Sequence, residues 1–113
     1  MDRKLRKQIQ HIAEEQGWAV GIGDTFIEFQ RYSIEGHDFV FEIDTENVNT
    51  LDEVRMKIIE YYNSFDVSYE TYLWLDDRGH GKNGAPDNMR DIYDDMQWCK
   101  NHIFYLSNAM ITK

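Results

Sequence analysis

The sequence predicts an α+β fold: an N-terminal helix, a three-stranded antiparallel meander, and then two or three helices, the last of them long. Three observations predict this order. Apolar residues recur at helical spacing near the N-terminus, three short segments rich in aromatic and β-branched residues follow, and the C-terminal third repeats apolar residues in steps of three and four. No linker composition or internal repeat divides the chain, so residues 1–113 form one predicted domain.

The first predicted element is a helix over residues 2–16, and Gly17 is its expected C-terminal stop. One side of this helix is apolar, with Leu5, Ile9, Ile12 and Ala13. The other side carries four basic residues, Arg3, Lys4, Arg6 and Lys7. The spacing therefore predicts an amphipathic helix whose outer surface is positively charged.

Three strands are expected over residues 18–22, 25–34 and 37–44, separated by turn-forming residues at 21–24 and 35–36. The third segment alternates clearly: Phe39, Phe41 and Ile43 on one side and Asp38, Glu42 and Asp44 on the other. This alternation predicts a sheet with one face packed against helices and one face in water.

A capping box marks the start of the next helix, with Thr50 as its N-cap and Glu53 at the third helical position. This helix, over residues 51–65, directs a set of large apolar residues inward: Leu51, Val54, Ile58, Tyr61, Tyr62 and Phe65. Asp66 is a candidate cap for a short helix over residues 67–77, although residues 72–75 are also compatible with a strand.

The last predicted helix extends from about residue 87 to about residue 110, after a loop over residues 79–86. It carries an a/d seam with 4-3-4-3-4 spacing: Ile92, Met96, Cys99, Ile103, Leu106 and Met110. A seam of this length packs along another helix. We expect an intramolecular helical hairpin, and pairing with a second copy of the chain is the alternative.

The formal net charge of -9 excludes a typical nucleic-acid binder and a protein that docks on anionic lipid, because both need clustered Lys and Arg. Cys99 is the single cysteine, so an intrachain disulfide is impossible. No signal-peptide pattern and no run of about 20 apolar residues occurs. A soluble, cytoplasmic protein is therefore expected.

The charge is unevenly distributed along the chain. Residues 1–13 have a balance of +3, from four basic residues and one acid, whereas residues 42–77 have a balance of -8, from ten acids and two basic residues. In the last helix, Asp91, Asp94 and Asp95 follow at i, i+3 and i+4 and so share one side. A solvated acidic surface is one interpretation, and an acidic surface that resembles a phosphate array and attracts a basic partner is the other.

The residues between Gly79 and Gly84 match the pattern G-x-G-x-x-G, but they are not part of a βαβ unit and do not form a Walker A loop. Nucleotide binding is thus a minor alternative, and a turn-forming connection between helices is the expected structure. Because His80 and Lys82 are polar residues on a glycine-rich loop, they are also candidates for contact with a partner.

Cys99 and His102 have i, i+3 spacing on the last helix, as two metal ligands could have. A structural zinc site needs four such ligands, and Cys99 belongs to the apolar seam, so we expect a buried, unreactive thiol and no metal site. No other motif indicates a cofactor or a catalytic centre. The sequence therefore predicts a protein without enzymatic activity.

The order of elements over residues 5–77, including the strand over 38–44 and the helix over 51–65, resembles small phage anti-CRISPR proteins that inhibit type II nucleases. The segments at 72–77 and 79–84 are also similar to small proteins of bacterial mobile elements. The resemblance implies an inhibitor that occupies the DNA-recognition groove of a host defence protein with an acidic, DNA-mimicking surface. Residues 79–113 extend beyond that compact form, and no inhibitory residue is carried over by a motif.

Seven residues are the candidate contacts with such a partner: Asp76, Asp77, His80, Lys82, Asp91, Asp94 and Asp95. The expected partner is a basic protein surface, for example of a CRISPR or restriction effector, and neither nucleic acid nor membrane is an expected direct partner. A homo-oligomeric adaptor that pairs through the C-terminal helix is the alternative.

Overall fold

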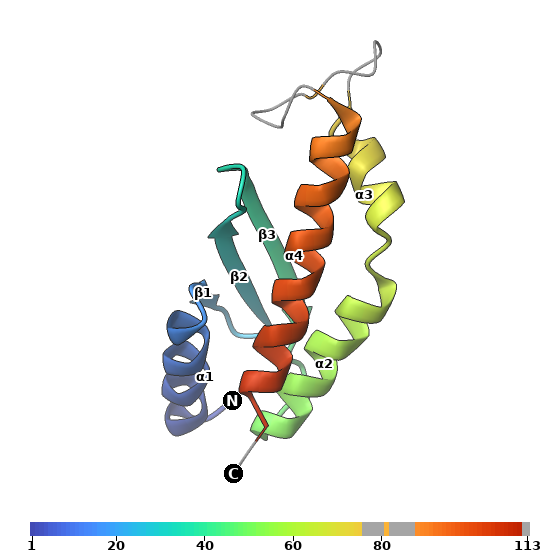
Figure 1. Ribbon diagram of the computed structural model, residues 1–113. Helices are drawn as coiled ribbons and strands as arrows, with labels where there is room; N and C mark the ends of the chain where they lie inside the picture. Colours follow the sequence, from blue (N-terminus) through green and yellow to red (C-terminus); the bar gives the residue numbers. More distant parts are fainter. Residues whose placement is uncertain (76–80, 82–87, 112–113) are drawn as a thin grey trace.

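The computed structural model describes residues 1–75, 81 and 88–111 (Figure 1). In chain order the elements are α1 (Arg3–Glu15), β1 (Ala19–Ile22), β2 (Phe26–Tyr32), β3 (Asp38–Asp44), α2 (Leu51–Ser64), α3 (Val67–Leu73) and α4 (Met89–Ala109). The α+β fold predicted from the sequence is confirmed, including the N-terminal helix, the three-stranded meander and the long C-terminal helix.

The helices begin and end at the residues that cap them. The Asp2 carboxylate accepts a hydrogen bond from Leu5 N at 2.8 Å at the start of α1, and Gly17 follows its C-terminus with a φ of +88°, in the left-handed region that glycine tolerates. At the start of α2, Thr50 Oγ1 accepts from Glu53 N at 3.1 Å, which confirms the predicted capping box.

Two predicted helix boundaries differ from the structure. Asp66 caps α3 as expected, but α3 ends at Leu73, and Leu75 instead forms an isolated antiparallel bridge with Gly81. The helical interpretation is therefore correct up to Leu73. The last helix begins at Met89, because the side chain of Asn88 accepts the hydrogen bond from Asp91 N and supplies its N-cap.

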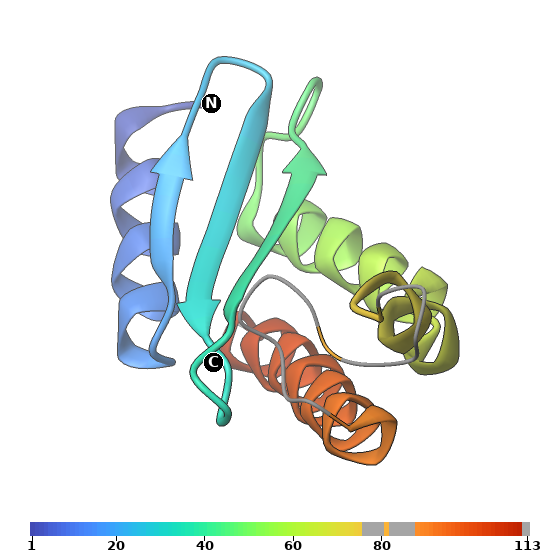
Figure 2. The same ribbon diagram turned by 90° about the horizontal axis from the view of Figure 1, so that it is seen from above.

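The three strands form one antiparallel sheet in the order β1-β2-β3. Along β2 and β3 burial alternates, so the odd-numbered residues face the helices and the even-numbered residues face away from them. Helix α1 lies along β1 at one side of the molecule, and α2 and α4 lie together at the other (Figures 1 and 2). We call the side of the even-numbered residues the open face.

Aromatic rings fill the space between the sheet and the helices. The indole of Trp18 makes edge contacts with Phe29, Phe39 and Phe41, with ring centroids 5.3–6.4 Å apart. Phe41 also stacks on Tyr61 of α2, with centroids 4.6 Å apart. These contacts hold the sheet and α2 together and make the inner face of the sheet rigid.

The a/d seam of α4 is completely buried within the chain. All six side chains of the seam are inaccessible to solvent: Ile92, Met96, Cys99, Ile103, Leu106 and Met110. They belong to the same hydrophobic cluster as the inner face of the sheet and α2. The intramolecular interpretation of the seam is confirmed, and a second copy could reach these residues only if the core opened.

Candidate functional site

The open face of the sheet carries a concentration of acidic residues. Its outward side chains on β2 and β3 include four acids, which we call the open-face acids: Glu28, Asp38, Glu42 and Asp44. No Lys or Arg lies among the described strand residues of this face. The hydrophobic neighbours Phe26, Tyr32 and Val40 are 37–69% exposed. The surface is therefore negatively charged with an apolar component, and no basic residue of the described strands on this face compensates its negative charge.

The strand register brings two of these acids directly opposite each other. Glu28 of β2 pairs with Glu42 of β3, and the backbone hydrogen bonds of β2 and β3 belong to the odd-numbered residues. Opposite residues in such a non-hydrogen-bonded pair have the closer Cα separation, about 4.5 Å. Like charges placed opposite one another across strands are unfavourable for stability. The open face thus holds negative charge at a cost in folding free energy.

Two shallow hollows adjoin the open-face acids. One, of about 210 Å³, lies over β1 and β2, where Ala19 and Gly21 leave room beside Glu28 and Gln30. The other, of about 240 Å³, lies between the edge of β3 and α2 and includes Glu42 and Asp44 among its lining residues. Both hollows have carboxylates at their surface that can bond to a basic side chain, and Lys57 of α2 also lines the second hollow.

Several acids of α2 and α3 have local roles, as do two of the open-face acids: Asp38 accepts from Gln30 Nε2 at 2.8 Å, and Asp44 accepts from Glu46 N at 2.9 Å. Asp52 forms an ion pair with Arg55 at 2.8 Å, and Glu60 lies 3.9 Å from Lys57. Asp66 caps α3. The strong negative balance of residues 42–77 therefore does not form one continuous surface, and its acids without an ion-pair partner in the described chain are distributed over β3, the loop after it, α2 and α3.

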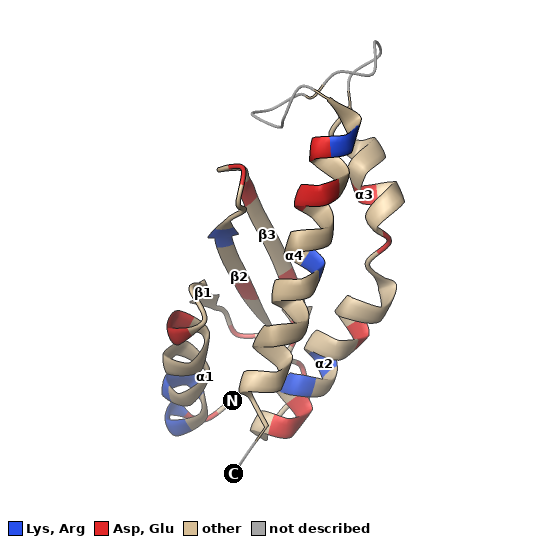
Figure 3. Cartoon of the chain, in the orientation of Figure 1, with Lys and Arg blue, Asp and Glu red and all other residues tan. Residues whose placement is uncertain are grey.

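The predicted acidic cluster of α4 is divided by the fold. Asp91 and Asp94 are exposed, as an interaction surface requires, and Figure 3 shows acidic residues on the first turns of α4 and basic residues on α1. Asp95 is only 1% exposed, so the expectation that it contacts a partner is wrong. It lies on the flank of the seam, where the hairpin between β2 and β3 covers it.

The buried carboxylate of Asp95 is paired with His37. His37 Nδ1 lies 2.9 Å from Asp95 Oδ2, and both side chains are completely inaccessible. Asp95 Oδ1 also accepts a hydrogen bond from Glu35 N at 3.3 Å. Ser33 accepts from His37 N through its hydroxyl at 3.1 Å. The tip of the hairpin is therefore attached to α4 by a polar cluster.

Burial lowers the pKa of His37, and the negative charges of Asp95 and Asp38 oppose this shift. A neutral imidazole that donates from Nδ1 to Asp95 leaves Nε2 as an acceptor, and Nε2 is buried without a hydrogen-bond partner in the described part of the chain. The ring of Trp74 packs against His37 with centroids 3.8 Å apart. The cluster joins α3, α4 and the sheet, a structural role.

Sequence analysis did not identify Arg31 as an important residue. Its guanidinium lies over the rings of Trp18 and Trp98, 5.3 and 4.8 Å from their centroids, and Nη1 donates to Gln16 O at 2.8 Å. Arg31 continues the inward alternation of Ile27 and Phe29, which is the signal that could have revealed it. It connects the end of α1 to the sheet and α4.

Cys99 and His102 do not form a metal site. Cys99 is fully buried, and burial raises the pKa of its thiol to about 12, so the expected unreactive thiol is supported. His102 Nδ1 donates to Trp98 O at 2.8 Å, and its ring stacks on the indole. Within residues 1–75, 81 and 88–111, no group of three His, Cys, Asp or Glu side chains is arranged to bind a metal ion.

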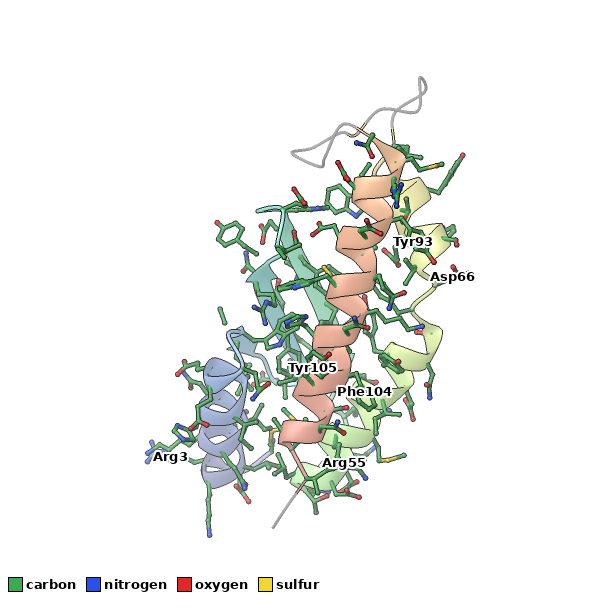
Figure 4. The ribbon with its side chains drawn as sticks, in the orientation of Figure 1. Arg3, Arg55, Asp66, Tyr93, Phe104 and Tyr105 are labelled. Carbon is green, nitrogen blue, oxygen red and sulfur yellow. The ribbon has the colours of Figure 1, made fainter. Side chains whose placement is uncertain are left out.

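The solvent side of α4 carries exposed aromatic residues. Tyr93, Phe104 and Tyr105 are 41–50% exposed, and Figure 4 shows them along the helix. Phe104 packs beside Tyr62, with centroids 5.4 Å apart. Phe104 also contacts Tyr105, with ring centroids 6.4 Å apart, whereas Tyr93 lies about three helical turns away, so the three rings form no single continuous patch.

Four of the seven predicted contact residues lie outside the described residues: Asp76, Asp77, His80 and Lys82. The same is true of most of the segment between Gly79 and Gly84, so nucleotide binding and partner contact by this segment stay predictions. None of the described helices has both the length and the apolar character needed to cross a membrane.

Comparison with known proteins adds no relative to this description. No protein-family model matches the chain, and no significant match was found among curated protein sequences or solved structures.

Proposed function

We propose that this chain is a non-enzymatic binding protein that attaches through an acidic surface to a basic protein surface. The observation that carries the proposal is the open face of the sheet, where four carboxylates are held on rigid strands with no basic residue among the described strand positions. Carboxylates at regular strand spacing create a negative potential that attracts a positively charged surface and accelerates association.

The position of the open-face acids supports a binding role over a general role in solubility. Acids scattered over a surface are sufficient for solubility and need not face each other. Here Glu28 and Glu42 are directly opposite in the strand register, which costs stability. A basic partner would remove this repulsion, and so part of the unfavourable energy in the free protein would be recovered on binding.

The partner class in this proposal is a nucleic-acid-handling protein, because such proteins have basic surfaces that recognise regularly spaced phosphates. In agreement with the resemblance to phage anti-CRISPR proteins, we propose an inhibitor of a host defence protein, encoded by a phage or mobile element. The acidic surface would occupy the nucleic-acid site of the partner as a DNA mimic, without any reaction.

A pull-down with purified CRISPR and restriction effectors, at low and high salt, tests this function. We expect binding that weakens as salt is raised, because exposed charges are screened. The variant Glu28→Gln, Asp38→Asn, Glu42→Gln should lose most of the binding. The matched control Glu14→Gln, Glu15→Gln, Asp52→Asn removes the same charge from α1 and α2, at positions that line neither hollow, and should retain it. Equal binding by both variants would contradict the proposal.

Asp91 and Asp94 form a separate exposed acidic position on α4, away from the open face. The variant Asp91→Asn, Asp94→Asn determines whether the partner also contacts this end of the molecule. If this variant loses binding and the open-face variant does not, the interface lies on α4, and the role of the open face is contradicted.

A further inference from the structure

β3 is an edge strand, and its outer backbone groups point away from the sheet. In the β2-β3 ladder, Ser33 N donates to His37 O, and Thr45 N donates to Thr25 O. Hydrogen-bonded pairs alternate along an antiparallel ladder, so every odd-numbered residue between these two pairs directs its N–H and C=O toward β2. The even-numbered residues therefore direct theirs toward the free edge, and no backbone hydrogen bond joins this edge to another described element.

The residues with these outward backbone groups are also the residues of the open face. Asp38, Val40, Glu42 and Asp44 direct toward the edge N–H and C=O groups that bond to no other backbone group of the described residues, and three carboxylates lie beside them. The strand has regular pairing with β2 over its whole length, without a bulge or a proline. A straight edge with unpaired donors and acceptors is a template for one more strand.

The hollow between β3 and α2 lies next to this edge, on the side of the sheet that faces the helices. It has a volume of about 240 Å³ and is lined in part by Lys57, Glu60, Tyr61 and Ser64 of α2. A strand placed beside β3 would alternate its side chains between the open face and this hollow. Beside Glu42 and Asp44, the surface therefore has room for both sets of side chains.

We propose that the free edge of β3 binds an extended, basic segment of the partner protein as an additional antiparallel strand. The proposal rests on the proposed function for the charge of the partner and adds how the partner is held. Backbone hydrogen bonds to the edge of β3 supply affinity, and the carboxylates select the sequence. Opposite Asp44, Glu42, Val40 and Asp38, in that order, the bound segment has a basic, a basic, an apolar and a basic residue at alternate positions.

A second copy of this chain is a poor occupant of the same edge. Two β3 strands paired antiparallel through their free edges would place acids close to acids, because three of the four outward residues are Asp or Glu. Like charges directly opposite each other destabilise a strand pair. The same carboxylates that attract a basic strand therefore oppose self-association through this edge.

The test uses a synthetic nine-residue peptide in which Lys, Lys, Val and Lys alternate with Thr, with both ends blocked. We expect measurable binding by fluorescence polarisation, and slower hydrogen exchange at the amides of Val40 and Glu42 but not of Phe41, which already donates within the ladder. Absence of binding by this peptide overturns the proposal.

Two methylated peptides of equal charge determine whether backbone bonds are involved. N-methylation of the second Lys and the Val removes donors that face β3, and we expect binding to weaken about tenfold or more, since each hydrogen bond contributes about 1 kcal/mol. N-methylation of the two Thr residues on either side of the Val leaves those donors intact and should change binding by less than about twofold. Equal binding of the two methylated peptides, or loss with the second only, overturns the proposal.

A protein variant gives an independent test. Val40→Pro removes an outward N–H without removing a bond to β2, and Val40→Thr is the control that keeps the N–H. We expect the proline variant alone to lose peptide binding, with its fold checked by circular dichroism. If Val40→Pro binds normally while Glu28→Gln, Asp38→Asn, Glu42→Gln does not, strand addition is wrong and the proposed acidic function stands.

Discussion

The inner and the open face of the sheet are built from alternate residues of the same strands, yet they differ in almost every physical property. On β3, Phe39, Phe41 and Ile43 are at most 5% exposed and pack against the helices. Their neighbours Glu42 and Asp44 project into water with no basic strand residue beside them in the described sheet. Burial stabilises one face, and charge repulsion weakens the other.

Because of this difference, substitutions on the two faces should have different consequences, and only the open face can change its residues without disrupting the core. Substitutions on the inner face change the core and therefore the free energy of unfolding. Substitutions on the open face change side chains that do not contribute to the core. If only stability were selected, neutral residues would be favoured there over like-charged pairs. If the open face binds a partner, the two faces should respond oppositely to mutation: the inner face should lose stability, and the open face should gain it while binding is lost.

The largest expected effect is on the inner face. Phe41 is 3% exposed and stacks on both Phe29 and Tyr61. Phe41→Ala should lower the free energy of unfolding by about 3–5 kcal/mol, because it removes apolar contacts and leaves a cavity. Urea denaturation followed by tryptophan fluorescence measures this loss. A change below about 1 kcal/mol would show that the aromatic cluster is not the main contact between the sheet and α2.

The second expected effect compares two neighbouring acids of α4. Asp95→Ala removes the buried partner of His37 and should lower the free energy of unfolding by about 3 kcal/mol. Asp94→Ala, at the adjacent exposed position, should change it by less than about 0.5 kcal/mol. Equal losses in the two variants would contradict the buried position of Asp95.

The polar cluster should also make stability depend on pH. Burial lowers the pKa of His37 in the folded chain below the value of about 6.5 in the unfolded chain. As the pH falls through about 6.5, the unfolded chain takes up this proton first, so His37 contributes a loss of stability that is absent above that pH.

His37→Asn tests this pH dependence because it keeps a donor for Asp95 but does not titrate. The decrease in unfolding free energy between pH 7.5 and pH 5.5 should be smaller in the variant than in the wild-type chain. Parallel curves for the two proteins would show that His37 has no lowered pKa.

The smallest effect on stability, with the opposite sign, is expected on the open face. Glu42→Gln removes the repulsion with Glu28 and should raise the free energy of unfolding by about 0.2–1 kcal/mol. Glu60→Gln on α2 is the matched control, because Glu60 lies near Lys57 and its loss should be neutral or slightly unfavourable. A stability loss in Glu42→Gln would contradict the comparison between the two faces.

Much of the fold could be predicted from local patterns. The capping box at Thr50, the stop at Gly17 and the seam of α4 are all where periodicity and cap residues place them. Less of the candidate site could be predicted. Alternation assigned Asp38, Glu42 and Asp44 to the outer side of a strand, but a helical spacing rule placed Asp95 with Asp91 and Asp94, because spacing defines a side of a helix without showing what covers it.

By itself, the sequence determined the order of the elements, the two faces of β3 and the buried seam of α4, since helical and strand periodicity depend only on residues close in the chain. The tertiary structure decided which acids are accessible and which are paired. His37 and Asp95 are 58 residues apart, and Glu28 faces Glu42 through strand register. Such contacts depend on how elements pack together, which no local pattern specifies, and they separate a carboxylate that stabilises the core from one that is free to bind.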